Sequence, residues 1–345
     1  MTQPALSRTV VILAAGDGTR MRSNLPKVLH PLAGRPMLSR IIDVAGSIDA
    51  TQICIVVAPH SSAAISAACG AQHTYVPQRE RRGTGHAVHT ALPALHASDG
   101  DVVILFGDTP LIQPSTIAAV IADKTTHGAT LSLLSFDVPA PHNYGRIVRD
   151  AAGTVTAIVE AKNCTPAQAL IREANSGIMV ASLGWVRSAL PRVTPNPLTN
   201  EYYLTDLVAL AVADHGSGAV RAVSASDPDD AWGVNDRAQL AAAEAILHQR
   251  TIAALLQAGV SIPHPGQVAI APEVHIAADT TILPGCVLTG ATEIGAGCVI
   301  GPQTTIDECR VGAGCTIPHS YLKHSTIAAD QHCAPYTVIV DGGRS

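Results

Sequence analysis

Charged residues are scarce in this sequence: Asp, Glu, Lys and Arg together make up 14% of the 345 residues, against about 25% in a typical soluble domain. The formal net charge is −5, and runs of Lys and Arg never exceed two residues. Proteins that bind nucleic acid or acidic lipid surfaces usually carry a basic patch or stripe. We therefore expect neither a nucleic acid nor a membrane surface among the partners.

Long apolar runs and paired cysteines are also missing. The longest apolar run, Leu207–Ala213, has seven residues, whereas a helix that spans a bilayer needs about 20. The N-terminus shows no signal-peptide pattern, so we expect a cytoplasmic protein. Eight cysteines in 345 residues are too few for a disulfide scaffold, and none of them forms a C-x-x-C pair that would indicate a zinc or thioredoxin-like motif, so we expect reduced thiols.

The length and the 47% content of hydrophobic residues predict two well-packed domains. In the first part of the chain, β-branched runs alternate with stretches that could be helical, which indicates an α/β fold with a mostly parallel sheet covered on both faces. Asp236–Ala258 contains no Gly or Pro and stops at Gly259, as expected for a connecting helix. The clearest strand candidates are Thr9–Ala15, Ile53–Ala58, Asp101–Phe106, Thr130–Phe136 and Thr154–Glu160.

Beyond Pro263 an apolar residue recurs at every sixth position, and a small or β-branched residue stands two positions before each of them. This is the pattern of a hexapeptide β-helix, in which the apolar side chains point into a triangular prism. The pattern slips by one residue near Val311 and returns at Ile317. The recurring residues are Ile270, Ile276, Ile282, Leu288, Ile294, Ile300 and Ile306.

Four cysteines share the spacing of this repeat. Cys286 and Cys298 occupy the small inward position, and Cys309 and Cys315 follow the same spacing after the slip. We expect them to pack inside the prism as small apolar residues and to take no part in catalysis.

A Gly-rich turn follows the first strand candidate. It reads LAAGDGTRM over residues 13–21 and is followed by LPK over residues 25–27. Such a turn lets phosphates approach backbone N–H groups, and Arg20 and Lys27 can neutralise their charge. The turn is not a dinucleotide-binding fingerprint, because Met21 stands where the third glycine is required, and it lacks the G-K-[ST] ending of a Walker loop.

The whole string LAAGDGTRM followed by LPK resembles the signature of sugar-1-phosphate nucleotidylyltransferases. Together with the hexapeptide repeat, further segments are similar to those of the bacterial family of bifunctional N-acetylglucosamine-1-phosphate uridylyltransferases/glucosamine-1-phosphate acetyltransferases. The further segments are Gln78 with GTGHA (83–87), FGD (106–108), YGRI (144–147), VEAK (159–162), NSGI (175–178), EYYLTD (201–206) and GVNDR (233–237).

The resemblance implies an architecture and an activity. It implies a Rossmann-like nucleotidyltransferase sheet in residues 1–234, a connecting helix in 235–262 and a short left-handed β-helix in 263–345. The implied reaction is Mg²⁺-dependent and forms UDP-N-acetylglucosamine and pyrophosphate from UTP and N-acetylglucosamine-1-phosphate. Because β-helices of this family usually trimerise through their faces, a homotrimer is implied as well.

The resemblance also assigns roles to individual residues. Arg20 and Lys27 would be catalytic residues that neutralise phosphate charge, and Asp108 and Asn235 would hold Mg²⁺ through oxygen atoms. The substrate-binding residues form two groups. The uridine group is Leu13, Ala14, Gly16, Gln78, Gly83 and Thr84, and the sugar group is Gly145, Glu160, Asn175 and Thr205.

Several of these residues have a structural interpretation too. Asp108 could cap the next helix, Asn235 could cap the helix that begins at Asp236, and Lys27 could be a solvated surface lysine. His86, within GTGHA, is expected to be structural. Two departures from the family pattern, RR before Gly83 and AW before Gly233, could alter the preference for sugar or nucleotide.

Three questions of activity stay open at this point. The acetyltransferase segments of the family, an R-x-R-P-G stretch and a later His, Lys and Tyr, do not occur in these residues, so acetyl transfer is not expected. The nucleotide or the sugar could differ from UTP and N-acetylglucosamine-1-phosphate. The chain could also be a nucleotide-sugar-binding regulator without turnover, although such a protein would be expected to lose a site residue, and Arg20, Lys27, Asp108 and Asn235 are all present.

Overall fold

The computed structural model describes residues 7–140 and 142–344. The chain divides into two compact units, one made of residues 1–30 and 35–239 and the other of residues 31–34 and 240–345. Each unit has a hydrophobic core of its own. None of the helices in the described part of the chain is long and apolar enough to cross a membrane.

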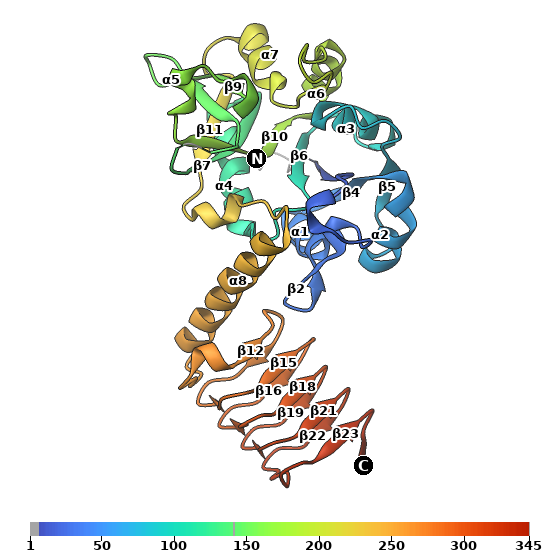
Figure 1. Cartoon of the computed structure of the whole chain (residues 1–345), viewed down its shortest axis with the longest axis vertical. Coiled ribbons are helices and arrows are strands. Elements are labelled where there is room, and N and C mark those ends of the chain that lie inside the picture. The colour runs from blue at the N-terminus through green and yellow to red at the C-terminus, as the bar shows by residue number, and fades with distance from the viewer. Residues whose placement is uncertain (1–6, 141, 345) are drawn as a thin grey trace, which may run out of the picture. The chain divides into compact units, whose positions relative to one another are not determined.

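The first unit contains one large sheet with helices on both faces (Figure 1). The strands of the large sheet are β1 (Arg8–Ala14), β4 (Ala50–Val57), β5 (Thr74–Pro77), β6 (Asp101–Phe106), β7 (Leu131–Asp137), β8 (Arg146–Arg149), β9 (Val155–Val159), β10 (Glu173–Ser182) and β11 (Val220–Ser224), and β3 (Arg35–Pro36) lies outside it. Its helices are α1 (Met37–Ser47), α2 (Ser62–Cys69), α3 (Thr84–Ala91), α4 (Pro114–His127), α5 (Pro166–Ala169), α6 (Leu183–Ala189) and α7 (Asp206–His215).

The Rossmann-like, mostly parallel sheet predicted from the sequence is confirmed. The strand order is β11-β7-β10-β6-β1-β4-β5, and β1 lies parallel to both β4 and β6. The exceptions are β10, which is antiparallel to β6 and β7, and the antiparallel pair β8–β9 beside it. The parallel strands therefore end at one edge, where ligands of open α/β sheets bind.

Alternate residues of β1 enter two different cores, which explains why the strand is apolar along its length. Val11 packs with residues of α3, α6 and α7 on one face. Val10 and Ile12 pack with residues of α1, α2 and α4 on the other face. A strand that is buried on both faces has no solvent side and shows no polar alternation.

The second unit is a left-handed β-helix that follows helix α8 (Arg237–Gln257), whose residues from Leu240 onward belong to this unit. Short parallel strands stack in three columns, so the prediction of a hexapeptide β-helix is confirmed. The strands of the columns are β12 (Ala269–Ile270), β13 (His275–Ile276), β14 (Thr281–Ile282), β15 (Val287–Thr289), β16 (Glu293–Ile294), β17 (Val299–Ile300), β18 (Thr305–Asp307), β19 (Arg310–Val311), β20 (Thr316–Ile317), β21 (Tyr321–Lys323), β22 (Thr326–Ile327) and β23 (Val338–Val340). This unit also contains β2 (Pro31–Leu32), which lies outside the columns, and β24 (Gly343–Arg344), which is antiparallel to β23.

The small inward position of each hexad joins neighbouring coils by hydrogen bonds. The Thr280 hydroxyl accepts from the backbone N–H of Cys298 at 3.1 Å, and the Cys298 sulfur accepts from the N–H of Cys315 at 3.4 Å. Thr292 accepts in the same way from Cys309 at 3.3 Å. All four cysteines of the repeat are buried in the prism, as expected.

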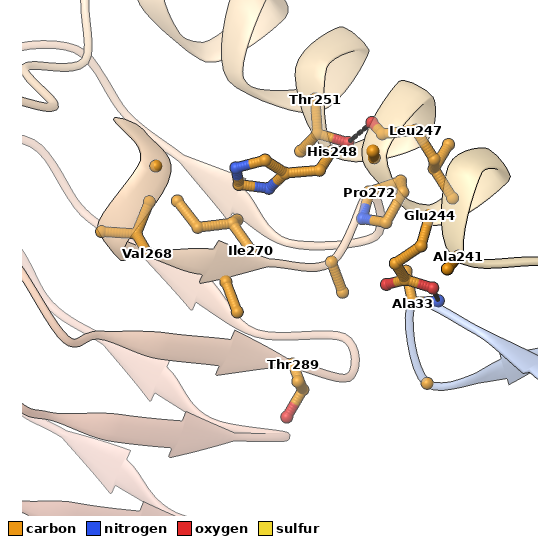
Figure 2. A pocket seen from close by; sticks show the side chains of 15 residues that line it. Ala33, Ala241, Glu244, Leu247, His248, Thr251, Val268, Ile270, Pro272 and Thr289 are labelled. Atoms are coloured by element: carbon orange, nitrogen blue, oxygen red, sulfur yellow. Dashed lines mark hydrogen bonds between the residues drawn. The ribbon is translucent and has the colours of Figure 1, made fainter. Parts of the chain in front are cut away.

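A cavity of 530 Å³ lies within the second unit, between α8, the turn at Ala33–Gly34 and the first coil of the β-helix (Figure 2). Its polar groups already have partners. The Glu244 carboxylate accepts from the N–H of Ala33 at 2.8 Å, and His248 Nε2 donates to the Pro265 carbonyl at 3.1 Å. No predicted site residue is among the described residues that line it.

Candidate active site

Two neighbouring strand ends position the Gly-rich turn and Asp108. Strands β1 and β6 are parallel partners, with Leu13 opposite Phe106. The N–H of Gly107 donates to the Leu13 carbonyl at 2.9 Å, so the two strand ends stay together as the chain leaves the sheet. The turn that follows β1 and the carboxylate that follows β6 therefore lie at the same edge of the sheet.

Gly18 allows Lys27 to approach this turn. Its φ is +58°, and a Cβ at this position would lie 2.5 Å from the Lys27 Cβ. A larger residue would be strained and would also collide with Lys27. Arg20 and Lys27 each stand on a short 3-10 helix, Thr19–Met21 and Lys27–Leu29 respectively.

The structure brings Arg20, Lys27, Asp108 and Asn235 together. Lys27 Nζ forms an ion pair with the Asp108 carboxylate and donates to Asn235 Oδ1 at 3.2 Å. Arg20 Nη2 donates to the same Asn235 oxygen at 3.0 Å. Asn235 is held nearby because the N–H of Val234 donates to the Asp108 carbonyl at 2.7 Å. Two cationic and two oxygen-bearing side chains thus share one small site.

The structural interpretations of these residues do not hold. Helix α8 is capped by Asp236, whose Oδ1 accepts from the N–H of Gln239 at 2.8 Å, and the Asn235 side chain is free to face Arg20 and Lys27. The helix after Asp108, α4, has Gln113 as its N-cap. The Lys27 side chain is only 10% exposed, so it is not a solvated surface lysine.

The uridine group comes from the end of β1 and the turn after it, from the residue after β5 and from the start of α3. Leu13 and Ala14 end β1, Gln78 follows β5, and Gly83 is the residue before α3. Gly83 has φ +98°, and a Cβ there would lie 2.5 Å from the Tyr202 carbonyl oxygen. This close approach of two backbones requires glycine at position 83.

Residues 202–205, which we name the clamp segment, tie this loop to the sugar group. The N–H of Tyr202 donates to the Arg82 carbonyl at 2.7 Å, and its carbonyl accepts from Gly85 at 2.8 Å. The Thr84 hydroxyl accepts from the N–H of Leu204 at 3.1 Å. At the other end, the Thr205 hydroxyl donates to Glu160 Oε1 at 3.0 Å.

Gly145, Glu160, Asn175 and Thr205 also meet. The N–H of Asn175 donates to the Gly145 carbonyl at 2.8 Å, and a Cβ on Gly145 would lie 3.6 Å from Glu160 Oε2. Burial raises the pKa of Glu160, the nearby charge of Glu201 raises it further, and the bond from Thr205 opposes the shift. The four residues thus form a small polar site with one carboxylate and one amide.

Three further residues, which were not among the predicted site residues, also form contacts with these segments. Tyr144 forms a hydrogen bond with the Gly233 backbone, and burial raises the pKa of its hydroxyl. Asp17, inside the Gly-rich turn, forms an ion pair with Arg81 of the loop before α3. The sequence could have indicated two of them: Tyr144 belongs to the YGRI segment, and Arg81 belongs to the RR pair before Gly83 that departs from the family pattern. Nothing in the sequence singled out Asp17.

The fold and this site define a sugar-1-phosphate nucleotidyltransferase. Residues 10–176 match the family described as the MobA-like NTP transferase domain. Residues 273–308 match the family described as bacterial transferase hexapeptide, with six repeats. Both matches agree with the units that the structure shows.

Relatives extend the match over nearly the whole chain. The bifunctional protein GlmU of Trichlorobacter lovleyi is 43% identical over 328 residues, which cover 94% of this chain and 71% of the relative. The GlmU proteins of Brevibacillus brevis and Mycolicibacterium gilvum are 39% and 41% identical and cover 97% and 96% of this chain, with 72% and 68% of the relatives covered. The chain belongs to the GlmU family.

Proposed function

We propose that the chain is a Mg²⁺-dependent uridylyltransferase that forms UDP-N-acetylglucosamine and pyrophosphate from UTP and N-acetylglucosamine-1-phosphate. The observation that carries this proposal is the meeting of Arg20, Lys27, Asp108 and Asn235 at the sheet edge. Two cations next to two oxygen ligands suit a reaction between two phosphate-bearing substrates. The family to which the chain belongs supports the same activity.

The oxygen atoms of Asp108 and Asn235 fit a magnesium ion. Lys27 Nζ contacts both of them, so a single cation can reach both oxygens. Carboxylate and amide oxygens are hard ligands, and Mg²⁺ usually takes only one or two carboxylates and keeps waters and phosphates as its other ligands. When bound, the ion would neutralise charge on the phosphates that it contacts.

The chain's own cations would neutralise the rest of the phosphate charge. Lys27 would exchange its bond with Asp108 for phosphate oxygens, and the Arg20 guanidinium would donate beside it. An oxygen of the sugar phosphate attacks the α-phosphorus of UTP, and the bond from that phosphorus to pyrophosphate breaks. Because the attacking phosphate is already ionised, no general base is required, and the side chains act by positioning and by charge.

The sugar group would orient the acceptor. Glu160 can accept hydrogen bonds from sugar hydroxyls, and Asn175 can both donate to and accept from an acetamido group. Gly145 stands directly beside them, because a Cβ at this position would lie 2.9 Å from Ile158 Cγ2 and 3.6 Å from Glu160 Oε2. This arrangement favours an N-acetylated sugar as the acceptor.

Pyrophosphate release by the purified chain tests the proposal. UTP, dTTP, GTP and CTP are each combined with N-acetylglucosamine-1-phosphate, glucose-1-phosphate and glucosamine-1-phosphate in the presence of Mg²⁺. We expect the pair of UTP and N-acetylglucosamine-1-phosphate to be the fastest and a chelator to stop the reaction. A different fastest pair would change the substrate, and UTP binding without release from any pair would indicate a regulatory protein. An acetyl-coenzyme A assay of the same sample checks the expectation that these 345 residues do not transfer acetyl groups.

We further propose a homotrimer that forms through an apolar face of the β-helix. The column β12-β15-β18-β21-β23 exposes Val287 and Tyr321, whereas the column β13-β16-β19-β22 exposes Glu293 and Arg310. Light scattering should give about three times 35.5 kDa. Tyr321→Lys should lower that mass and Glu293→Lys should not, and a clean monomer of the unmodified chain would contradict the assembly.

A further inference from the structure

The orientation of the Gln78 amide is fixed by two hydrogen bonds. Gln78 is 4% exposed. Its Nε2 donates to the Gly83 carbonyl at 3.2 Å and lies 3.1 Å from His86 Nδ1. An amide nitrogen carries two protons, so both are used. Within residues 7–140 and 142–344, no hydrogen bond is formed by Gln78 Oε1, which leaves this oxygen available to a ligand.

The bond to Gln78 determines the protonation of His86. An amide nitrogen can only donate, so His86 Nδ1 must accept, and the ring proton must lie on Nε2. A protonated imidazole donates from both nitrogens. Its Nδ1–H would then point at the N–H of the Gln78 amide. Gln78 Nε2 could therefore not donate to both the Gly83 carbonyl and His86, as it does in the structure. His86 therefore holds the amide only in its neutral state.

The surroundings keep His86 neutral. Burial lowers its pKa, the charges of Arg82 and His89 lower it further, and the charge and backbone carbonyl of Glu80 oppose the shift. Arg82 is held in place by Tyr202: its Nη2 donates to the Tyr202 hydroxyl at 3.1 Å, and its guanidinium lies 4.8 Å from the ring centre. A cavity of 410 Å³ is lined by His86 together with Arg82, His89 and Tyr202. Leu190, Pro191 and Val193 also line it and carry no charge.

We propose that His86 is a positioning residue for base selection: by accepting from Gln78, it holds the amide so that only Oε1 is presented to the base of the nucleotide. Uracil has a donor at N3, which this oxygen accepts. Cytosine has an acceptor at N3, which it repels. The inference rests on the proposed function, because it takes Gln78 to face the base of UTP.

The proposal makes base selection depend on pH. Because the pKa of His86 lies below its usual value of about 6.5, His86 is neutral at pH 7 to 8 and selection is complete there. As the pH falls through the imidazole pKa, Nδ1 becomes a donor, and the Gln78 amide loses its bond or turns over. A turned amide presents N–H to the base, which favours cytosine. Selection for UTP over CTP is therefore lost on the acid side.

The test is the ratio of kcat/KM for UTP to that for CTP, measured from about pH 5.5 to 8.5. We expect the ratio of the unmodified chain to fall as the pH is lowered. His86→Leu removes the acceptor and should lower the ratio by about tenfold at pH 8 and leave it independent of pH. His86→Asn offers a carboxamide oxygen in place of Nδ1, so it should restore the ratio without restoring the pH dependence. His89→Leu, on the same helix, should keep both the ratio and its pH dependence.

Three results would overturn the inference: a ratio that does not change with pH in the unmodified chain, an unchanged ratio in His86→Leu, or equal losses in His86→Leu and His86→Asn. The last would indicate damage to α3 instead of a lost acceptor. If the unmodified chain turns over neither nucleotide, the proposed function fails separately. The same four proteins are then compared by calorimetric binding of UTP and CTP, to which the same expectations apply.

Discussion

Replacing Asp108 by Asn is expected to lower kcat by about 1000-fold while the protein remains folded. The amide keeps the size of the side chain and one oxygen atom, but it removes the negative charge. That charge pairs with Lys27 in the structure and would hold the metal ion during the reaction. Without it, neither the lysine nor the ion is fixed where the pyrophosphate leaves.

The loss is measured as steady-state pyrophosphate release at saturating UTP and sugar phosphate. Asp137→Asn is a matched control, because Asp137 is an exposed carboxylate of the same unit that pairs with Arg172 on the surface. It should retain the activity of the unmodified chain. If Asp108→Asn kept more than a tenth of the activity, Asp108 would not be a metal ligand in the reaction.

Replacing Ile294 by Ala should lower the free energy of unfolding by about 3 kcal/mol. Ile294 lies inside the β-helix, where it is 3% exposed and stacks between Ile276 and Val311 of the neighbouring coils. Its truncation leaves a cavity that the coils cannot close, because their backbones are fixed by hydrogen bonds to one another.

Urea unfolding at a fixed protomer concentration measures this effect, since assembly makes stability depend on concentration. Glu293→Ala is the control on the same strand. The Glu293 side chain is exposed and forms an ion pair with Arg310 at the surface, so its removal should change the free energy of unfolding by no more than about 0.5 kcal/mol. Equal losses in the two variants would mean that the hexad position does not decide stability.

The hexads of the β-helix from Ile270 to Ile306 were predictable residue by residue. Its hexad is a local geometric period, and each inward Ile stands next to the equivalent residue of the next coil, as Ile294 does with Val311. The slip of one residue near Val311 was also visible in the sequence. It shortens the coil from Ile294 to Val311 to 17 residues, and this coil still closes one turn of the prism. A repeat of this kind needs no information from distant parts of the chain.

The sheet of the first unit was predictable only in part. Asp101–Phe106 coincides with β6, since a short apolar run between turns indicates a buried strand. By contrast, β10 was not among the expected strands. Its Asn175, Ser176 and Gly177 interrupt the apolar pattern, and Gly177 has φ +88°. The pairing of β10 with β7 shifts register at these residues. The antiparallel direction of β10 is set by pairing with strands that are distant in sequence, so no local pattern predicts it.

The candidate site was also predictable only in part. Arg20, Lys27, Asp108 and Asn235 stand in motifs, so their sequence contexts named them before the structure placed them together. The contact of Arg82 with Tyr202 joins residues that are 120 positions apart, and no spacing predicts it. His86 shows the difference between the two kinds of information: the motif contains it, but only the structure shows that it faces the Gln78 amide.

The clamp segment joins the two groups of residues that we propose to bind the two substrates. It is bonded at one end to the Arg82–Gly85 loop and at the other to Glu160. If UTP binds where we propose, a shift of this loop on binding would also shift the carboxylate that receives the sugar. By linkage, whatever factor UTP applies to the affinity for the sugar phosphate, the sugar phosphate applies to the affinity for UTP. Under the proposed function, this one peptide segment would therefore couple the two binding events.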